Sequence, residues 1–168
     1  MKHIYILFAI LLTYSVGHSQ MAAAKEIPPN VSHRIKIKAP VNAVWEYLLK
    51  FENLSEFGSE IVSKSTTKGI GLGSLRDVVF KDGTQRSEEV EVIAPRFKKI
   101  GFKVLTSDKI FSRYFYVFEI NRANDFECFV TLKSYYGLNS EKESNQVKRK
   151  VKKELETLLK GLKLYFEN

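Results

Sequence analysis

Three glutamates in one strand-like segment are the side chains best placed for acid–base chemistry. Glu88, Glu89 and Glu91 lie in the segment 85–93, whose β-branched residues predict a strand. Because side chains alternate along a strand, Glu88 faces opposite to Glu89 and Glu91 and shares a face with Val90. We expect Glu89 and Glu91 to meet water and Glu88 to be buried, where a carboxylate needs a partner.

Arg76 is the predicted partner of Glu88. It lies on the preceding strand-like segment, 74–80, across a short hairpin. Because side chains alternate along a strand, Arg76 shares a face with Val78 and Phe80. A structural ion pair and contact with a bound ligand both fit this placement. In an alternative, catalytic interpretation, burial raises the pKa of Glu88, which acts as general acid or base, with a tyrosine as proton donor or oxyanion stabiliser.

The segment 111–121 is unusually aromatic and predicts one wall of a binding site. Tyr114, Tyr116 and Phe118 alternate onto one face, forming a wide apolar wall with hydroxyl tips that could orient a ligand. Plain core packing explains the same residues equally well. The last strand-like segment, 126–136, offers two alternating sets, and periodicity does not decide which faces inward. The first set is Phe129, Thr131, Lys133 and Tyr135, and the second is Cys128, Val130 and Leu132.

Histidine and cysteine are too scarce for most metal and triad sites. The histidines are His3, His18 and His33, and Cys128 is the one cysteine. If an N-terminal signal is removed, only His33 remains, which excludes a Ser-His-Asp triad in the core and a His-rich zinc site. One cysteine excludes an internal disulfide. The run 69–73 lacks the following helix of a nucleotide-binding loop and predicts a turn. We expect neither a metal nor another cofactor.

The first twenty residues have the pattern of a secretory signal peptide. Lys2 and His3 precede the apolar run 4–12, and small residues follow at 17–19. The run is shorter than the roughly 18 apolar residues that span a bilayer. We expect residues 1–19 to be removed and 20–30 to form an extended lead-in, which predicts a secreted or periplasmic protein. If translation starts at Met21, the protein is cytoplasmic instead.

Composition favours one domain with a basic surface. The chain has 168 residues, 44% of them apolar, which suits one well-buried core. The formal net charge is +8, and such a surface is either simply solvated or steers the protein toward an anionic membrane. No arginine-rich tract with interleaved aromatics is present, so nucleic acid is not expected as a partner.

The elements that position these residues follow a recognisable order. The segment 33–39 predicts a strand, 40–51 an amphipathic helix and 53–57 a second short helix. Six further strand-like runs follow, joined mostly by turns too short for crossover helices, which predicts an antiparallel sheet. These runs are 61–67, 74–80, 85–93, 98–106, 111–121 and 126–136.

A long amphipathic helix is predicted from Ser140, where Ser-Glu-Lys-Glu matches a capping box. Its apolar face includes Val151, Leu155 and Leu159. The opposite face carries a basic ridge, which is either an ordinary solvated face or a membrane-docking surface. The ridge comprises Arg149, Lys152, Lys153, Lys160 and Lys163. We therefore predict an α+β fold in which a seven-stranded curved antiparallel sheet grips the C-terminal helix, with two short helices after the first strand.

Residues 31–166 resemble the START-like, helix-grip (SRPBCC) superfamily, and within it the polyketide cyclase/dehydrase and lipid-transport group. The resemblance rests on 35–45, on 71–78, and on Asp82-Gly83 followed by 88–93. It implies a START-like domain over 31–168 with a cavity for a hydrophobic molecule or lipid. The hairpin at 81–84 is too short for the gate loop of the related abscisic-acid receptors, so hormone sensing is not implied.

The resemblance also suggests where a ligand would lie. Lys133 stands where the family usually has an acidic residue, which implies a ligand with an acidic group. We predict binding, with carriage as an extension, of a hydrophobic small molecule or lipid between the sheet and the last helix; the alternative is a cyclase or dehydratase acting through Glu88. The predicted ligand-binding residues are Arg76, Val78, Phe80, Glu88, Val90, Tyr114, Tyr116, Phe118, Lys133, Tyr135, Val151, Leu155 and Leu159.

Overall fold

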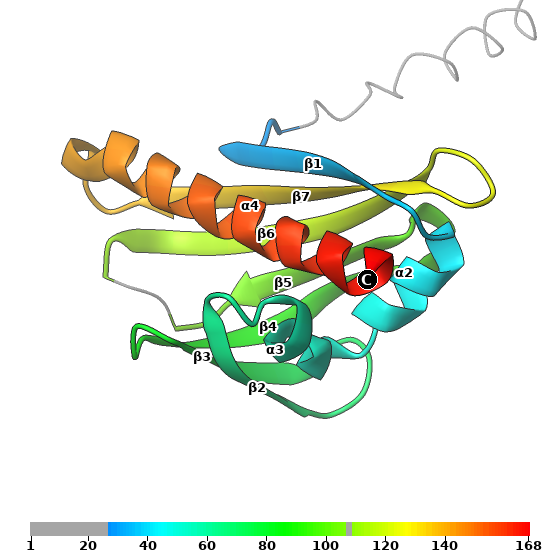
Figure 1. Cartoon of the computed structure of the whole chain (residues 1–168). Helices are drawn as coiled ribbons and strands as arrows, with labels where there is room; N and C mark the ends of the chain where they lie inside the picture. The colour runs from blue at the N-terminus through cyan, green and yellow to red at the C-terminus, as the bar shows by residue number, and fades with distance from the viewer. Residues whose placement is uncertain (1–26, 107–108) are drawn as a thin grey trace, which may run out of the picture.

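In the computed structural model, which describes residues 27–106 and 109–168, a seven-stranded antiparallel sheet curves around one long helix (Figure 1). The strand order is β1-β7-β6-β5-β4-β3-β2, so β1 joins the sheet by pairing with β7. The strands are β1 (Val31–Ile37), β2 (Val62–Lys68), β3 (Leu75–Phe80), β4 (Gln85–Ala94), β5 (Lys99–Val104), β6 (Phe111–Arg122) and β7 (Cys128–Leu138).

Two short helices and one long helix accompany the sheet within the described residues. Helices α2 (Val41–Leu48) and α3 (Leu54–Phe57) follow β1, with the 3₁₀ turn η1 (Phe51–Asn53) between them. Helix α4 (Ser144–Glu167) crosses the concave face of the sheet (Figure 1). The remaining 3₁₀ turns are η2 (Pro95–Phe97) and η3 (Glu141–Glu143). The predicted α+β helix-grip arrangement is therefore confirmed.

The start of α4 differs from the predicted capping box. The chain turns into η3 directly after Ser140, and α4 proper begins at Ser144. Ser140 makes no side-chain capping hydrogen bond, so the reciprocal serine–glutamate cap is not formed. The sequence signal marked the right place for the helix to begin, and the 3₁₀ turn replaces the cap there.

The core lies between the concave face of the sheet and α4. Strands β6 and β7 alternate buried and half-buried residues, as a sheet covered on one face does. Leu155, Leu159 and Leu162 of α4 are at most 2% exposed. Gly161 lets α4 approach α3, because a Cβ there would lie 1.8 Å from the carbonyl oxygen of Phe57. The C-terminal half of α4 is thus fixed tightly in the core.

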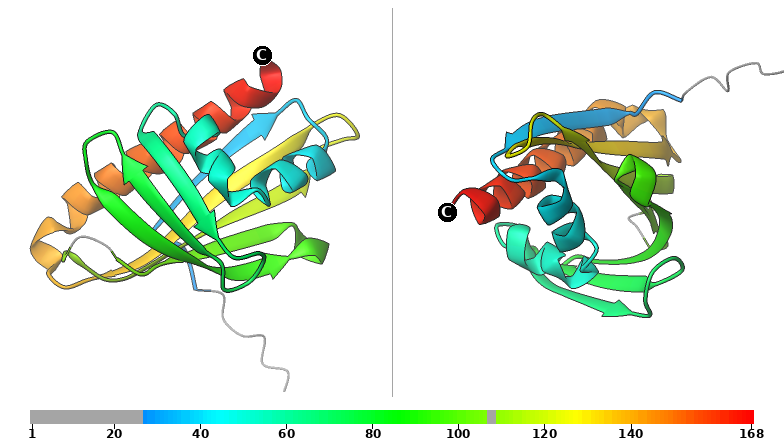
Figure 2. Two further views of the ribbon diagram at one scale, coloured as in Figure 1. Left: turned by 90° about the horizontal axis from the view of Figure 1, so that it is seen from below. Right: turned by 90° about the vertical axis from the view of Figure 1, so that its right-hand side faces the viewer.

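The antiparallel turns gather at two opposite ends of the molecule. The tip end carries the β2–β3 loop (69–74), η2, the β6–β7 hairpin (123–127) and α2, and it faces the viewer in the right-hand panel of Figure 2. The mouth end carries the β3–β4 hairpin (81–84), η3 and the first turns of α4.

The predicted signal peptide, 1–19, and residues 20–26 of the predicted lead-in lie outside the described residues. None of the helices in the described ranges has both the length and the apolarity that a membrane crossing requires. Removal of a signal and the resulting location stay predictions.

Candidate functional site

A buried polar network surrounds Glu88 in the middle of the sheet. Glu88 pairs in register with Arg76 on β3, and both side chains are inside, at 0% and 2% exposure. Arg76 donates from Nε and Nη2 to Oε2 of Glu88 at 2.8 and 2.6 Å. The hydroxyl of Tyr116 donates to Oε1 at 2.8 Å. The predicted pairing of Glu88 with Arg76 is confirmed.

Arg76 ties this network to the short helices and to the aromatic core. Its Nη1 donates to the carbonyl oxygen of Phe51 at 3.1 Å, and its Nη2 donates to the hydroxyl of Tyr116 at 2.5 Å. The guanidinium carbon lies 3.9 Å from the centre of the Phe102 ring, a distance at which a cation attracts a ring face. The arginine is therefore held on every side by protein groups.

Glu88 is held ionised, contrary to the catalytic prediction. Burial alone would raise the pKa of Glu88, but the charges of Arg76 and Arg86 and the hydrogen bonds from Tyr116 and Arg76 outweigh burial and lower it. Burial raises the pKa of Tyr116 well above its ordinary value. The predicted raised pKa of Glu88 is wrong because two cations, not one, flank the carboxylate. A carboxylate that has no exposed surface, and whose two oxygens are already paired with protein donors, is poorly suited to proton transfer with a substrate.

Arg86 is the functional candidate that the sequence reasoning missed. Its Nε lies 2.7 Å from Oε1 of Glu88, and its Nη1 donates to Oε1 of Glu154 on α4 at 2.8 Å. Burial alone would lower the pKa of Arg86, but Glu154 and Glu88 hold it above the ordinary value. Arg86 lies two residues before Glu88 on the same strand, so both side chains face the same side of the sheet. This alternation is the signal in the sequence that could have identified Arg86.

The polar network opens to solvent at the mouth end. A cavity of about 100 Å³ lies there between the sheet and α4, beside Arg86. Its apolar walls are Phe80, Phe111, Tyr114 and Val151. An outer hollow of about 390 Å³ shares Phe80, Asp82, Lys150 and Glu154 with it. Three predicted site residues, Phe80, Tyr114 and Val151, therefore line a real cavity.

The deeper part of the predicted chamber is filled. A side chain facing a void large enough for water would keep accessible surface, and Glu88 and Leu159 keep 0%. The other predicted lining residues of this region are at most 2% exposed, namely Val78, Val90, Phe118 and Leu155. In this conformation the predicted cavity between the sheet and the last helix is therefore restricted to the mouth end. Ligand contact by these deep residues stays a prediction that requires the helix to move.

Lys133 and Tyr135 were predicted to face the ligand, and that placement is wrong. On β7 the buried set is Cys128, Val130, Leu132, Ser134 and Tyr136. Lys133 therefore lies on the outer face, where its Nζ is 2.7 Å from Oε2 of Glu119. The Tyr135 ring lies on the same outer face, 6.3 Å from that of Phe115. Neither side chain can orient a ligand beneath α4.

The described residues contain no cluster of three or more His, Cys, Asp or Glu side chains arranged to hold a metal ion. His33 is about one-third exposed, with Nδ1 3.8 Å from Oε1 of Glu156 on α4.

A family model identifies the family of the chain, and solved structures share its fold. The family model described as polyketide cyclase/dehydrase and lipid transport matches residues 28–167. No curated protein matches the sequence significantly. A START superfamily protein from Mycobacterium smegmatis has a similar structure, with a TM-score of 0.68 at 15% identity over 82% of this chain and 96% of that one.

Two plant structures extend the same likeness. The major latex-like protein of Panax ginseng matches with a TM-score of 0.67 at 14% identity, over 82% of this chain and 97% of that one. Norcoclaurine synthase of Thalictrum flavum, solved with dopamine and hydroxybenzaldehyde, matches with a TM-score of 0.64 at 13% identity, over 80% and 84%. At these identities the likeness shows the fold alone.

Proposed function

The chain belongs to the polyketide cyclase/dehydrase and lipid transport family, and we propose that it binds a hydrophobic molecule with an anionic group at the mouth end. Family and fold make it a helix-grip domain of the kind that binds hydrophobic ligands. The observation that carries the proposal is Arg86, a buried guanidinium at the inner wall of an aromatic-lined cavity.

Charge balance explains why an anion fits beside Arg86. Arg76 and Arg86 are matched inside the network by Glu88 and Glu154. Glu154 lies on α4 and Arg86 on β4, so their ion pair joins the helix to the sheet across the cavity. A ligand carboxylate, sulfonate or phosphate that replaces Glu154 at Arg86 leaves the two guanidinium charges balanced. The apolar body of the ligand then contacts Tyr114, Phe80 and the helix.

The N-terminal half of α4 is the part that can open. Between Ser144 and Glu154 only Val147 and Val151 are buried, whereas 155–162 buries five side chains. Drug-sized ligands occupy pockets of about 300–1,000 Å³, so the cavity of about 100 Å³ must merge with the outer hollow. Lifting these first turns breaks few apolar contacts and separates Glu154 from Arg86, so we expect local opening there to cost less than at 155–162.

The test compares Glu154→Gln with the parent chain in binding an anionic probe, anilinonaphthalene sulfonate, and a neutral one, Nile red. Removing the competing carboxylate leaves one guanidinium charge uncompensated, so anionic-probe affinity should rise by about tenfold or more. Glu156→Gln is the matched control, since Glu156 lies on the same helix and pairs with Lys152 at the surface.

The neutral probe separates electrostatics from loosening of the helix. If Glu154→Gln merely frees α4, both probes gain affinity equally, and the proposed role of Arg86 fails. Equal anionic-probe affinity in the parent, Glu154→Gln and Glu156→Gln would also reject it. Native mass spectrometry of protein purified from its own host then identifies the ligand, and an acidic lipid or aromatic acid is the expected class.

A further inference from the structure

Exposed apolar side chains are concentrated at the tip end of the molecule. Among the described residues nine large apolar side chains are exposed, and seven of them lie on or beside the turns and helix end at this end. These seven are Ile70, Leu72, Leu75, Phe97, Phe126, Leu164 and Tyr165. Single exposed apolar residues need no explanation, but their collection at one end does.

Ordered turns, and not loose loops, hold these side chains outward. Phe97 is 62% exposed at the end of η2, where Lys98 follows in the left-handed conformation with φ of 49°. Phe126 is 78% exposed in the β6–β7 hairpin, and its N–H donates to Oδ1 of Asn124 at 2.9 Å. Ile70 is fully exposed in the glycine-rich β2–β3 loop. Each turn therefore presents a protruding apolar tip.

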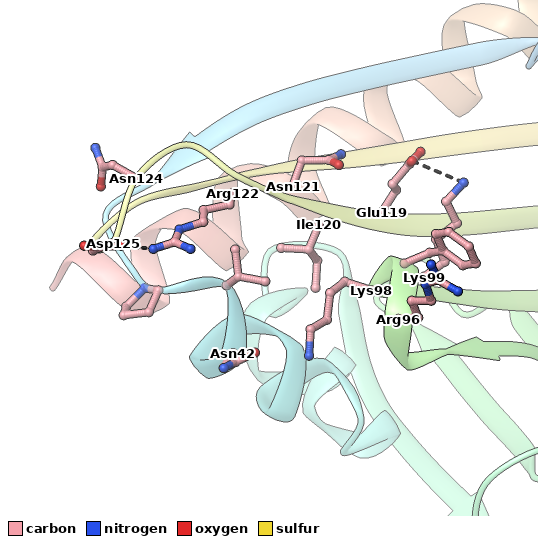
Figure 3. A pocket seen from close by; sticks show the side chains of 13 residues that line it. Asn42, Arg96, Lys98, Lys99, Glu119, Ile120, Asn121, Arg122, Asn124 and Asp125 are labelled. Atoms are coloured by element: carbon pink, nitrogen blue, oxygen red, sulfur yellow. Dashed lines mark hydrogen bonds and ion pairs between the residues drawn. The ribbon is translucent and has the colours of Figure 1, made fainter.

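A cationic pocket lies between two of these tips. Figure 3 shows it between the start of α2, η2 and the β6–β7 hairpin. The pocket has a volume of about 590 Å³. Its two carboxylates are already paired, Glu119 with Lys99 and Asp125 with Arg122. Its other two cations contact aromatic rings: Arg96 lies 5.7 Å from the centre of the Phe97 ring, and Nζ of Lys98 lies 5.1 Å from that of Trp45. No ion pair to a carboxylate is formed by either cation within the described residues.

We propose that the tip end docks on an anionic phospholipid bilayer. Phe97 and Phe126 enter the boundary between headgroups and acyl chains, while Arg96 and Lys98 contact lipid phosphates in and around the pocket. A bilayer suits this surface better than a protein partner. The apolar residues are separate protrusions divided by a polar pocket, and a protein interface needs a continuous complementary core.

This surface differs from the basic ridge of α4. Three ridge cations already face carboxylates: Lys152 lies 3.7 Å from Glu156, Lys160 lies 3.6 Å from Glu60, and Lys163 lies 3.7 Å from Glu167. Docking by the tip end leaves the mouth end facing water, so it is independent of the proposed ligand site (Figure 1).

Vesicle co-sedimentation of the full chain tests the proposal, with phosphatidylcholine vesicles that contain phosphatidylglycerol. Phe97→Ser and Phe126→Ser should each lower the partition coefficient by about tenfold, since each removes a large apolar side chain from the boundary. The double variant Arg96→Gln/Lys98→Gln should lower it about tenfold or more on these vesicles and little on pure phosphatidylcholine. Leu105→Ser is the matched control, because Leu105 is 46% exposed away from the tip end.

A second set of variants locates the contact. Tryptophan placed at 97 or 126 should be quenched by brominated lipids, and tryptophan at 105 should not, with the buried Trp45 as the common background. Quenching at 105 alone, or equal binding by the parent and both serine variants, overturns the proposal. So does a loss of binding in Lys152→Gln/Lys160→Gln that exceeds the loss in Arg96→Gln/Lys98→Gln. Self-association that Phe97→Ser abolishes, without vesicle binding, would assign the surface to a second copy instead.

Discussion

Replacing Glu88 by glutamine removes the anion on which two buried guanidinium groups depend. Glu88 is 0% exposed and receives Arg76 at 2.6 and 2.8 Å and Arg86 at 2.7 Å. Glutamine keeps the shape, so no cavity forms, and the loss is electrostatic. Removing one partner of a buried ion pair costs about 3–5 kcal/mol. For a chain of this size that corresponds to a fall in Tm of roughly 10 °C.

The assay is urea unfolding followed by circular dichroism, with Glu119→Gln as the control. Glu119 also contacts two cations, Lys99 at 3.2 Å and Lys133 at 2.7 Å, but on the outer face of the sheet. Partly exposed pairs contribute about 1 kcal/mol or less. The reasoning is refuted if Glu88→Gln and Glu119→Gln lose the same free energy of unfolding, because burial would then have no effect on the pair.

Acid titration supplies an independent check. The pKa of Glu88 is lowered from its ordinary value of 4.5. Its contribution to stability is therefore fully present above the unfolded pKa and is lost as the pH falls through the lower folded value. Below about pH 4.5 the parent should lose free energy of unfolding more steeply than Glu88→Gln, since only the parent has this carboxylate to protonate. Parallel curves for the two proteins would contradict the lowered pKa.

Three further predictions concern packing and reactivity. Gly161→Ala should lower the free energy of unfolding by about 2 kcal/mol or more, because overpacking against the Phe57 carbonyl outweighs the gain in helix propensity. Lys160→Ala, at the exposed neighbouring position, should change that free energy little, and urea midpoints measure both variants. Tyr116→Phe should lose about 1–3 kcal/mol, since a buried hydrogen-bond donor to Glu88 disappears, and a melt equal to that of the parent would contradict this role. The Cys128 thiol should not react with Ellman's reagent at pH 8 in the folded protein and should react in urea, because burial raises its pKa to about 11; rapid labelling of the native protein would disprove this.

The antiparallel pairing of consecutive strands and the Arg76–Glu88 pair were predictable because both follow from local rules, whereas the pairing of β1 with β7 joins distant parts of the chain. Short turns force antiparallel neighbours, and parity across one hairpin places two side chains on the same face. On β7 the alternation of side chains did not identify the buried face, because apolar residues occur on both faces. Phe129 lies on the outer face, where the guanidinium of Arg34 covers its ring at 3.8 Å. An aromatic side chain covered in this way mimics a core residue in the sequence pattern, so periodicity left both faces open. The role of Lys133 rested on the family resemblance instead, and the structure places Lys133 and Tyr135 on the outer face.

The prediction of a raised pKa for Glu88 was wrong for a different reason. Desolvation was predicted correctly, and it is indeed the largest single influence on that pKa. The direction reverses because the charges of Arg76 and Arg86 and the hydrogen bonds from Tyr116 and Arg76 together outweigh burial. Arg86 is held there partly by Glu154 from a helix far along the chain. Local pairing rules describe one hairpin at a time. A three-element network of this kind emerges only when the helix is placed on the sheet.

The size of a cavity cannot be predicted from periodicity either. Alternation assigns side chains to one face of a strand or helix, but it does not fix the distance between the sheet and α4. Here that distance is set unequally along α4. Gly161 brings the C-terminal half against the backbone of Phe57, which closes the interior around Leu159 and Leu162. Toward the mouth end the Arg86–Glu154 ion pair spans the gap instead. An ion pair can exchange one anion for another, whereas a backbone contact has no substitute. In the proposed binding mode, space for a ligand therefore opens from the mouth end, where this exchangeable ion pair joins α4 to the sheet.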